Sequence, residues 1–211
     1  MTLDKAEQHR RERIVSERDQ GISPMFEAFY LEAIIYAANC ADTAFQGFSS
    51  ALASRSENAK IVASVHEALT HSAALSRFFW ASPKARGVAH ARAGKLRSAF
   101  GLTEASALYD RDLRNALEHF DERLDAYLLE DHAGFFFPSP IVAEASFAED
   151  ELAHIFRLVD PIDQVFVLLG QQYEFGRTRQ EVQAVLASAY RMVESGSRLL
   201  VTQAAVAARG L

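Results

Sequence analysis

Residues 110–128, DRDLRNALEHFDERLDAYL, combine an apolar stripe with a densely charged face, and this stretch constrains the fold more than any other. Its apolar residues recur at steps of three and four, the spacing that gathers side chains on one side of an α-helix. That side must be covered by other parts of the chain, so the stretch predicts a helix within a larger core. The stripe consists of Leu113, Ala116, Leu117, Phe120, Leu124, Tyr127 and Leu128.

Other stretches repeat this spacing and predict a mainly α-helical bundle. Residues 24–55 and 59–81 carry long apolar stripes, and residues 178–208 carry a final one. Alanine is abundant and β-branched residues are few, which also favours helix. Residues 1–20 interleave acidic and basic helix formers, which predicts a solvated N-terminal helix or arm. The core of the bundle is expected within residues 24–131.

One passage in the C-terminal half departs from helical spacing. Between residues 154 and 175, β-branched and aromatic residues lie on both sides of the turn-forming sequence DPID, which predicts an antiparallel β-hairpin. The preceding sequence GFFFPSP, at residues 134–140, predicts a loop. No repeat and no linker-like segment separates these parts, so residues 1–211 are expected to form a single domain.

The bulk properties of the chain restrict the classes of function. The net charge of −6 at pH 7 argues against broad coating of nucleic acid but leaves room for a local basic site. Cys40 is the single cysteine, so no internal disulfide can form and a reducing, cytoplasmic setting is expected. The N-terminal sequence is too charged for a secretion signal, and no uncharged apolar run approaches the roughly 20 residues that span a bilayer. No association with a membrane is therefore expected.

Two histidine patterns resemble metal sites without matching them. His66 and His71 are separated by four residues, whereas a zinc-protease helix needs three so that both rings share a face. Glu151 and His154 form one Glu-x-x-His pair, but a di-iron bundle needs two such pairs with partner glutamates. The sequence therefore predicts no metal site and no cofactor.

The most basic stretch of the chain lies between residues 84 and 97 and contains no acidic residue. Such a cluster suits contacts to the phosphate backbone of RNA. A solvated helix face has the same composition and is the commoner meaning of a charge run. The cationic residues are Lys84, Arg86, Arg92, Lys95 and Arg97.

The charged face of the helix predicted at 110–128 carries Arg114, Asn115 and, after three further residues, His119. Residues of these types can perform metal-free phosphodiester chemistry, because histidine transfers a proton and arginine stabilises charge on a phosphate. On an ideal helix Arg114 and His119 point ~140° apart, so a kink or a second copy of the helix is needed to bring them together. Carboxylates that repel a phosphate crowd the motif. They belong to Glu118, Asp121, Glu122 and Asp125.

Arg114, Asn115 and His119 resemble the motif of the HEPN superfamily of all-helical nucleases and nucleotide-binding domains. Active members carry an arginine, a small polar residue that is often asparagine, and a histidine a few residues further on. The longer string RNALEHFDERLD, together with THSAALSRFFW and RLVDP, also resembles a recurrent signature of small bacterial helical proteins. The resemblance extends over most of residues 24–200.

The resemblance implies an HEPN-like helical bundle that forms a homodimer, with the motif at the dimer interface. It also implies metal-independent RNA cleavage in toxin or defence systems, and an antitoxin or another protein as partner. Some toxins of the family are neutralised by a nucleotidyltransferase partner, and these often have a tyrosine two places after the histidine. This chain has Asp121 at that position. In a homodimer, Arg111 of one chain can meet Glu118 or Glu122 of the other across a two-fold axis.

Each residue of the motif has an expected role in RNA cleavage. His119 removes the proton of a ribose 2′-hydroxyl or protonates the leaving oxygen. Arg114 stabilises the charge on the phosphate, and Asn115 orients the phosphate or the histidine. Glu118 or Glu122 holds the imidazole in place. The residues expected to support the motif are Arg111, Glu118, Asp121 and Glu122.

A non-enzymatic dimerising module is the alternative from a different class of function. Its Arg, Glu, Asp and His cluster would form a structural salt-bridge network or bind a protein partner. A small-molecule pocket within the bundle is a third hypothesis. One observation separates these hypotheses, because Arg114 and His119 either line an open cleft or are buried in salt bridges.

Overall fold

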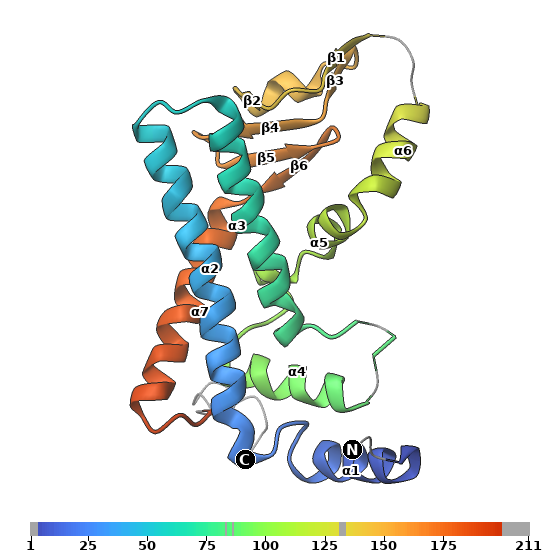
Figure 1. Ribbon diagram of the computed structural model, residues 1–211, viewed down its shortest axis with the longest axis vertical. Coiled ribbons are helices and arrows are strands. Elements are labelled where there is room, and N and C mark those ends of the chain that lie inside the picture. The colour runs from blue at the N-terminus through green and yellow to red at the C-terminus, as the bar shows by residue number, and fades with distance from the viewer. Residues whose placement is uncertain (1–3, 83, 86, 131–133, 200–211) are drawn as a thin grey trace. The chain divides into compact units, whose positions relative to one another are not determined.

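The computed structural model describes residues 4–82, 84–85, 87–130 and 134–199. Within this part, α-helices form most of the structure, a small β-region lies in the C-terminal half, and a long helix follows it (Figure 1). The prediction of a mainly α-helical fold with a late β-region and a final helix is confirmed. The helices are α1 (Lys5–Arg18), α2 (Glu27–Ala53), α3 (Asn58–Phe79), α4 (Gly87–Phe100), α5 (Arg111–Glu118), α6 (Phe120–Glu130) and α7 (Gly176–Glu194), with short 3₁₀ turns η1 (Pro24–Phe26), η2 (Ala107–Tyr109) and η3 (Ala145–Glu149).

Contacts between residues divide the chain into two compact units, although the sequence contains no linker. Helices α2, α3 and α7 each have residues in both units, so these boundaries fall inside helices. Unit 1 consists of Met1–Ala38, Ala74–Tyr109 and Ala184–Leu211, and unit 2 consists of Asn39–Ala73 and Asp110–Gln183.

In unit 1, α1 packs against α4. The predicted solvated character of α1 is confirmed, since none of its residues is buried. The turn after α1 approaches α4 closely at Gly21, which has φ +86°, and a Cβ there would lie only 2.1 Å from the backbone nitrogen of Arg92. Only glycine fits this position. A small apolar cluster of Leu31, Ala99 and Met192 joins α2, α4 and α7 within this unit.

A buried carboxylate ties three segments of unit 1 together. The side chain of Glu27, at the start of α2, is 5% exposed and lies 2.9 Å from Nζ of Lys95 on α4. Its other oxygen accepts hydrogen bonds from Nε of Arg198 at 2.8 Å and from the backbone N–H of Leu199 at 3.1 Å. Lys95 also donates to the carbonyl oxygen of Ile22. The charge of Glu27 is therefore compensated within the unit, as a buried carboxylate requires.

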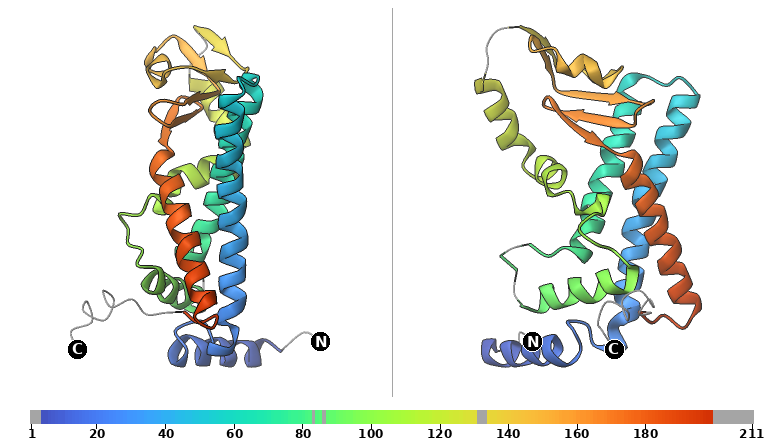
Figure 2. Two further views of the ribbon diagram at one scale, coloured as in Figure 1. Left: turned by 90° about the vertical axis from the view of Figure 1, so that its left-hand side faces the viewer. Right: turned by 180° about the vertical axis from the view of Figure 1, so that it is seen from behind.

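The β-region of unit 2 consists of two small sheets. Strands β1 (Phe135–Phe137) and β3 (Ala153–Ile155) form a parallel pair. The second sheet has the order β2-β4-β5-β6, in which β2 runs parallel to β4 and the other pairs are antiparallel. In the views of Figure 1 and Figure 2, β4, β5 and β6 lie side by side in this sheet. The strands of this sheet are β2 (Ile141–Val142), β4 (Arg157–Asp160), β5 (Val165–Leu168) and β6 (Gln171–Glu174).

The predicted antiparallel hairpin is confirmed at β4 and β5, but the predicted range of residues 154–175 also contains β6 and the end of β3, which belongs to the other sheet. Strands β4 and β5 pair with Leu158 opposite Val167, and the predicted turn joins them. Asp160 is buried and stabilises this turn, because its Oδ1 accepts hydrogen bonds from the backbone N–H groups of Ile162 and Asp163. The chain then reverses again at Gly170, which has φ +74°, and continues as β6.

The prediction of a loop for residues 134–140 is wrong over the three phenylalanines, which form β1. Aromatic side chains favour a strand, and the partner strand β3 begins only at Ala153. The pairing is thus determined by a segment that is distant in the sequence.

The core of unit 2 lies between the paired helices α2 and α3 and the four-stranded sheet. Phe175 is fully buried and contacts both Phe45 and Phe48 of α2, with ring centroids 6.1 Å and 5.5 Å away. Leu113 and Ala116 of α5 belong to the same core. Helix α5 is thereby fixed against the sheet by the apolar stripe that the sequence predicts.

The continuous helix predicted at 110–128 is interrupted at His119, which separates α5 from α6. His119 has φ −118° and ψ 42°, outside the helical region. The stripe is buried only before the interruption: α6 has no fully buried residue, and Leu128 is exposed. A continuous helix at this position is therefore a wrong prediction.

The final helix is shorter than predicted. Helix α7 ends at Glu194, and Gly196 with φ +100° follows it. The backbone N–H of Ser197 returns to the carbonyl oxygen of Met192, a common end for a helix. The predicted continuation through residues 200–208 lies outside the described residues.

Candidate functional site

The sequence-predicted motif surrounds the interruption between α5 and α6. Asp110 begins α5, because its Oδ1 accepts the backbone N–H groups of Asp112 and Leu113 at 2.8 Å and 3.1 Å. The backbone N–H of His119 donates to the carbonyl oxygen of Asn115 at 3.0 Å, which closes the last turn of α5. His119 is therefore held by the backbone, whereas its side chain is free to face solvent.

The side chains of the motif face solvent to different degrees. Those of Asn115 and His119 are exposed, and that of Arg114 is half-buried. Nδ1 of His119 lies 3.6 Å from a carboxylate oxygen of Glu122, and these two side chains are 57% and 77% exposed. At this distance and exposure the pair contributes little to stability. Within the described part of the chain, no side-chain hydrogen bond or ion pair engages Arg114 or Asn115.

The structure thus brings some of the predicted residues together and leaves others apart. His119 is beside Glu122, as the predicted supporting role requires. Within the described residues of a single chain, no hydrogen bond joins the side chains of Arg114 and His119. Glu118 and Asp121 are exposed, and the side chain of Arg111 lies outside the described part.

The basic stretch predicted to contact RNA is largely engaged within unit 1. Lys95 pairs with Glu27, and Nη1 of Arg97 donates to the carbonyl oxygen of Phe79 at the end of α3. Arg92 is half-buried, and its Nε is buried without a hydrogen-bond partner. Lys84 is exposed, and Arg86 lies outside the described residues.

The histidines that resembled metal ligands occupy other environments. His66 is half-buried against Phe166, and burial lowers its pKa, with a further contribution from the charge of Arg157. Nε2 of His71 lies 3.9 Å from Oε1 of Glu67. His154 is buried, and its ring stacks on that of Phe136 with the centroids 4.5 Å apart. Among the residues that the structure describes, no group of His, Cys, Asp and Glu side chains is placed to hold a metal ion.

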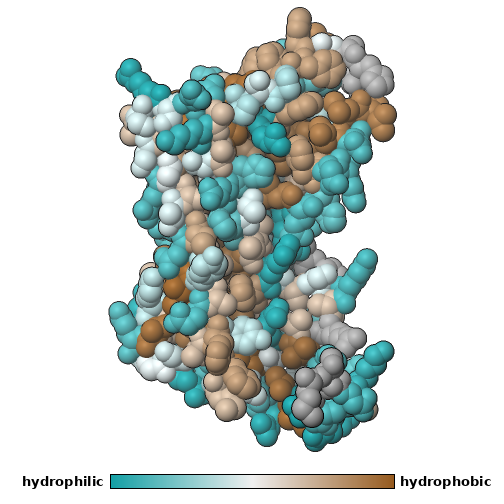
Figure 3. All heavy atoms as spheres, viewed as in Figure 1, coloured by the Kyte–Doolittle hydropathy of each residue, from teal (hydrophilic) through white to brown (hydrophobic). Residues whose placement is uncertain are grey.

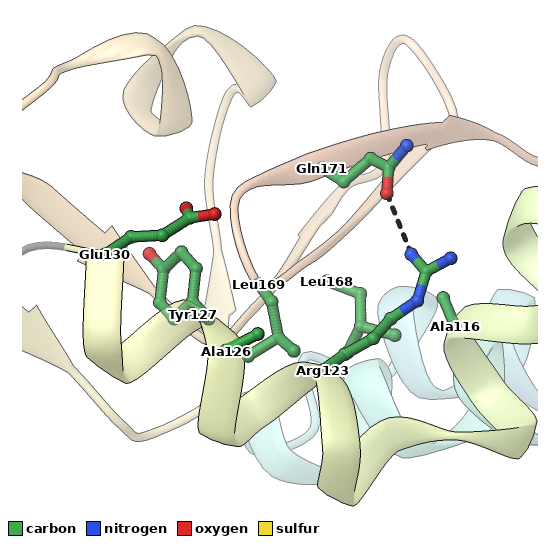
Figure 4. A pocket seen from close by; sticks show the side chains of 8 residues that line it. All are labelled: Ala116, Arg123, Ala126, Tyr127, Glu130, Leu168, Leu169 and Gln171. Atoms are coloured by element: carbon green, nitrogen blue, oxygen red, sulfur yellow. Dashed lines mark hydrogen bonds between the residues drawn. The ribbon is translucent and has the colours of Figure 1, made fainter.

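A pocket that the sequence did not reveal lies between α6 and the turn that joins β5 to β6 (Figure 4). Its volume is about 220 Å³. On one side Nη1 of Arg123 donates to Oε1 of Gln171 at 3.1 Å and to the hydroxyl of Tyr173 at 3.5 Å. The Tyr173 hydroxyl itself donates to Gln171 Oε1 at 2.7 Å. This network fixes the guanidinium group of Arg123 at the edge of the pocket.

Tyr127 and Glu130 lie on the opposite side of the pocket, with Leu168 and Leu169 between them and Arg123 (Figure 4). Burial raises the pKa of Tyr127, the charge of Glu130 raises it further, and a hydrogen bond with the backbone of Ile155 acts in the opposite direction. The phenol is therefore protonated at neutral pH and can donate a hydrogen bond. The pocket thus offers a cation, an apolar middle and acceptor groups.

The helical half of this pocket has a sequence signal, and the other half has none. Arg123, Tyr127 and Glu130 recur at steps of four and three, so they share one side of α6. Gln171 comes from a strand 48 residues after Arg123, and no local pattern connects the two. In the sequence pattern, Tyr127 belongs to the apolar stripe of residues 110–128.

Apolar side chains are exposed near the end of α6 and on β1, and Figure 3 shows hydrophobic atoms gathered in this region. None of the described helices is both long and apolar enough to cross a membrane. The exposed residues are Leu128, Leu129, Phe135, Phe136 and Leu152.

Comparison of the chain with protein-family models, with curated proteins and with solved structures finds no match.

Proposed function

We propose that this protein is an HEPN-like, metal-independent endoribonuclease or a related RNA-handling protein, with Arg114, Asn115 and His119 as its site. The observation that carries the proposal is the interruption of the helix at His119. It places an exposed imidazole beside the carboxylate of Glu122, 3.6 Å away. A general acid or base needs both access to the substrate and a group that orients it.

The state of the neighbouring side chains also supports a ligand-facing site. A structural salt-bridge network would hold these residues in buried ion pairs. Instead, within the described residues, no other side chain forms a hydrogen bond with the side chain of Arg114 or Asn115. The His119–Glu122 pair is exposed to solvent. Polar groups left uncommitted in this way are available to a phosphate and a ribose.

The proposed mechanism assigns proton transfer to His119, which takes the proton of the 2′-hydroxyl or returns one to the leaving oxygen. Arg114 donates hydrogen bonds to the phosphate as negative charge develops on it. No hydrogen bond joins the two side chains within the described part of one chain. In this proposal, a second copy of the chain therefore supplies the missing partner. The exposed face formed by Asn115, Glu118, His119 and Glu122 joins the copies.

An assay against total RNA in the presence of EDTA tests this function. The wild-type protein is expected to cleave RNA without metal, and His119→Ala is expected to cleave it about 10²–10⁴-fold more slowly, the range for loss of a general acid–base. His90 is also an exposed histidine and is not part of the motif, so His90→Ala is the matched control. Absence of both cleavage and RNA binding in the wild type would refute the proposal.

A protein-binding module is the second candidate function, and the exposed apolar residues of α6 and β1 favour it. Leu129 and Phe135 are 75% and 70% exposed. Exposed apolar side chains that lie together often mark an interface with another protein. On this hypothesis Leu129→Lys abolishes self-association or partner binding, and His119→Ala leaves both unchanged.

A further inference from the structure

The pocket between α6 and the β5–β6 turn combines three features that together describe a ligand. The first is the immobilised guanidinium group of Arg123. Its Nη1 is engaged by Gln171 and Tyr173. An arginine has five N–H donors in a rigid plane, so the remaining donors can bind an anionic oxygen without further ordering of the side chain.

The second feature is a flat, immobilised wall on the opposite side. The ring of Tyr127 meets the rings of His154 and Phe156 edge-on, with centroids 5.9 Å away in both cases. Gly170 packs beside this ring, since a Cβ there would lie at an ordinary contact distance of 3.5 Å from Tyr127 Cε2. With the leucines of the floor, this wall suits a planar ring that stacks on aromatic and apolar surface.

The third feature is the carboxylate of Glu130, which is exposed and lies next to the Tyr127 ring (Figure 4). An ionised carboxylate only accepts hydrogen bonds, through two oxygens. It therefore selects a ring that presents N–H donors at its edge. Arg123 and Glu130 lie at opposite sides of the apolar floor, so the ligand carries an anion at one end and N–H donors at the other.

Among the components of RNA, a guanine nucleotide fits this pattern best. The Watson–Crick edge of guanine presents two adjacent donors, the ring N1–H and the exocyclic amino group, which match the two carboxylate oxygens. Adenine and cytosine present an amino group beside an acceptor nitrogen, so they offer a carboxylate one good hydrogen bond. Uracil presents a single N–H between two carbonyl oxygens, which a carboxylate repels.

We propose that this pocket is a guanine-nucleotide subsite, in which Glu130 accepts hydrogen bonds from the guanine edge and Arg123 binds the phosphate. The inference rests on the proposed function, because it takes the ligand to be a nucleotide of the RNA bound at His119. Arg123 follows His119 by about one helical turn, ~5.4 Å along the axis, so the subsite adjoins the motif. The volume of about 220 Å³ lies below the roughly 300–1,000 Å³ of pockets that enclose drug-sized ligands, which agrees with enclosure of the base alone.

Titration calorimetry with the 211-residue protein tests the subsite. GMP, AMP, CMP, UMP and inorganic phosphate are the probes. Wild-type protein is expected to bind GMP about tenfold more tightly than UMP, within the range for a bidentate contact to a base. Glu130→Gln is expected to reduce this preference to less than about threefold, because an amide replaces one acceptor by a donor. Arg123→Gln is expected to weaken all four nucleotides together, since each carries the phosphate.

The controls separate loss of the subsite from loss of the fold. Glu104 is an exposed glutamate outside the pocket, so Glu104→Gln should leave every affinity unchanged. Glu130 is exposed, and Glu130→Gln should unfold at the wild-type urea concentration. Equal binding of the four nucleotides by the wild type, or a GMP preference that survives Glu130→Gln, overturns the subsite.

RNA cleavage and RNA binding, measured in parallel on wild type and His119→Ala, distinguish this inference from the proposed function. RNA handling that depends on His119, together with equal affinity for all nucleotides, overturns the subsite alone. GMP binding that depends on Glu130, without any RNA binding or cleavage, overturns the proposed function alone. Failure of both measurements overturns both.

Discussion

The backbone N–H of Arg123 donates a hydrogen bond to the carbonyl oxygen of His119 over 3.1 Å. This bond belongs to the first turn of α6, and it connects the histidine predicted from sequence with the arginine of the pocket. His119 ends α5, and its carbonyl oxygen accepts a hydrogen bond from the first turn of α6. The proposed catalytic group and the pocket are therefore placed by the same local backbone geometry, and changes to their side chains can be tested separately.

Arg114→Ala is expected to lower RNA cleavage by about 10²–10³-fold, the usual cost of losing one donor to a developing oxyanion. Stability should stay near the wild-type value, because no described side chain pairs with the guanidinium group. Arg114→Lys should recover part of the activity, since it keeps the charge but not the planar donor fork. Initial rates in EDTA measure the effect, and Arg13→Ala on exposed α1 is the control. Wild-type rates for Arg114→Ala, with His119→Ala inactive, would remove Arg114 from the site.

Glu122→Arg is expected to weaken the proposed homodimer. Glu122 is exposed beside His119, so a like charge introduced there would repel the cations of the facing copy across a partly dry interface. Sedimentation velocity over a concentration series gives the dissociation constant, and Glu67→Arg, at an exposed position of α3, is the control. The rate of cleavage should follow the concentration of dimer. A wild-type protein that is monomeric at tens of micromolar and still cleaves RNA would exclude this interface.

Sequence periodicity predicted the long helices, because the apolar stripe of each helix by itself indicates that the helix packs against a core. The stripes at residues 24–55 and 59–81 became α2 and α3, because an apolar stripe requires a core whatever covers it. The turn at Asp160 was predicted for a local reason as well, since its carboxylate accepts N–H groups two and three residues further on. Such features depend on residues close together in the chain.

The features that the sequence did not predict depend on distant residues. The stripe at 110–128 continues through His119, yet Leu113 and Ala116 are buried while α6 has no fully buried residue. The three phenylalanines form β1 only because β3 pairs with them. The pocket requires Gln171 beside Arg123, from a strand with no sequence signal of a site. The same holds for Lys95, whose position in a basic run concealed its partner Glu27.

Phe120→Ala is expected to destabilise unit 2 by about 1–3 kcal/mol, less than the roughly 3–5 kcal/mol for a fully buried phenylalanine. The ring of Phe120 is half-buried against the core, and the guanidinium group of Arg157 lies 4.6 Å from its centroid. Phe175→Ala is the comparison, because Phe175 is fully buried and should reach the larger value. Urea unfolding measures both losses of unfolding free energy, provided that the variants share the same dependence of this free energy on urea concentration. A loss for Phe120→Ala equal to that for Phe175→Ala would show that the interruption at His119 does not loosen the packing of α6.

Glu27→Gln is expected to destabilise unit 1 at neutral pH by about 1.5–3 kcal/mol, the range for hydrogen bonds to charged groups. Burial acts to raise the pKa of Glu27, but hydrogen bonds from Lys95, Leu199 and Arg198 outweigh it, and the pKa lies below its ordinary value of 4.5. A carboxyl group with a lowered pKa in the folded state contributes stability that is present above its unfolded pKa. That contribution is lost as the pH falls through the folded value.

The difference in unfolding free energy between wild type and Glu27→Gln should therefore be constant from about pH 6 to 8 and shrink below the ordinary pKa of 4.5. Urea midpoints at a series of pH values measure it. Glu32→Gln, at an exposed position of the same helix, is the control for the general effect of losing a negative charge. A difference that grows on acidification would mean that burial outweighs the hydrogen bonds of Glu27. The carboxyl group would then be protonated in the folded state, and its contact with Lys95 would not be an ion pair at acidic pH.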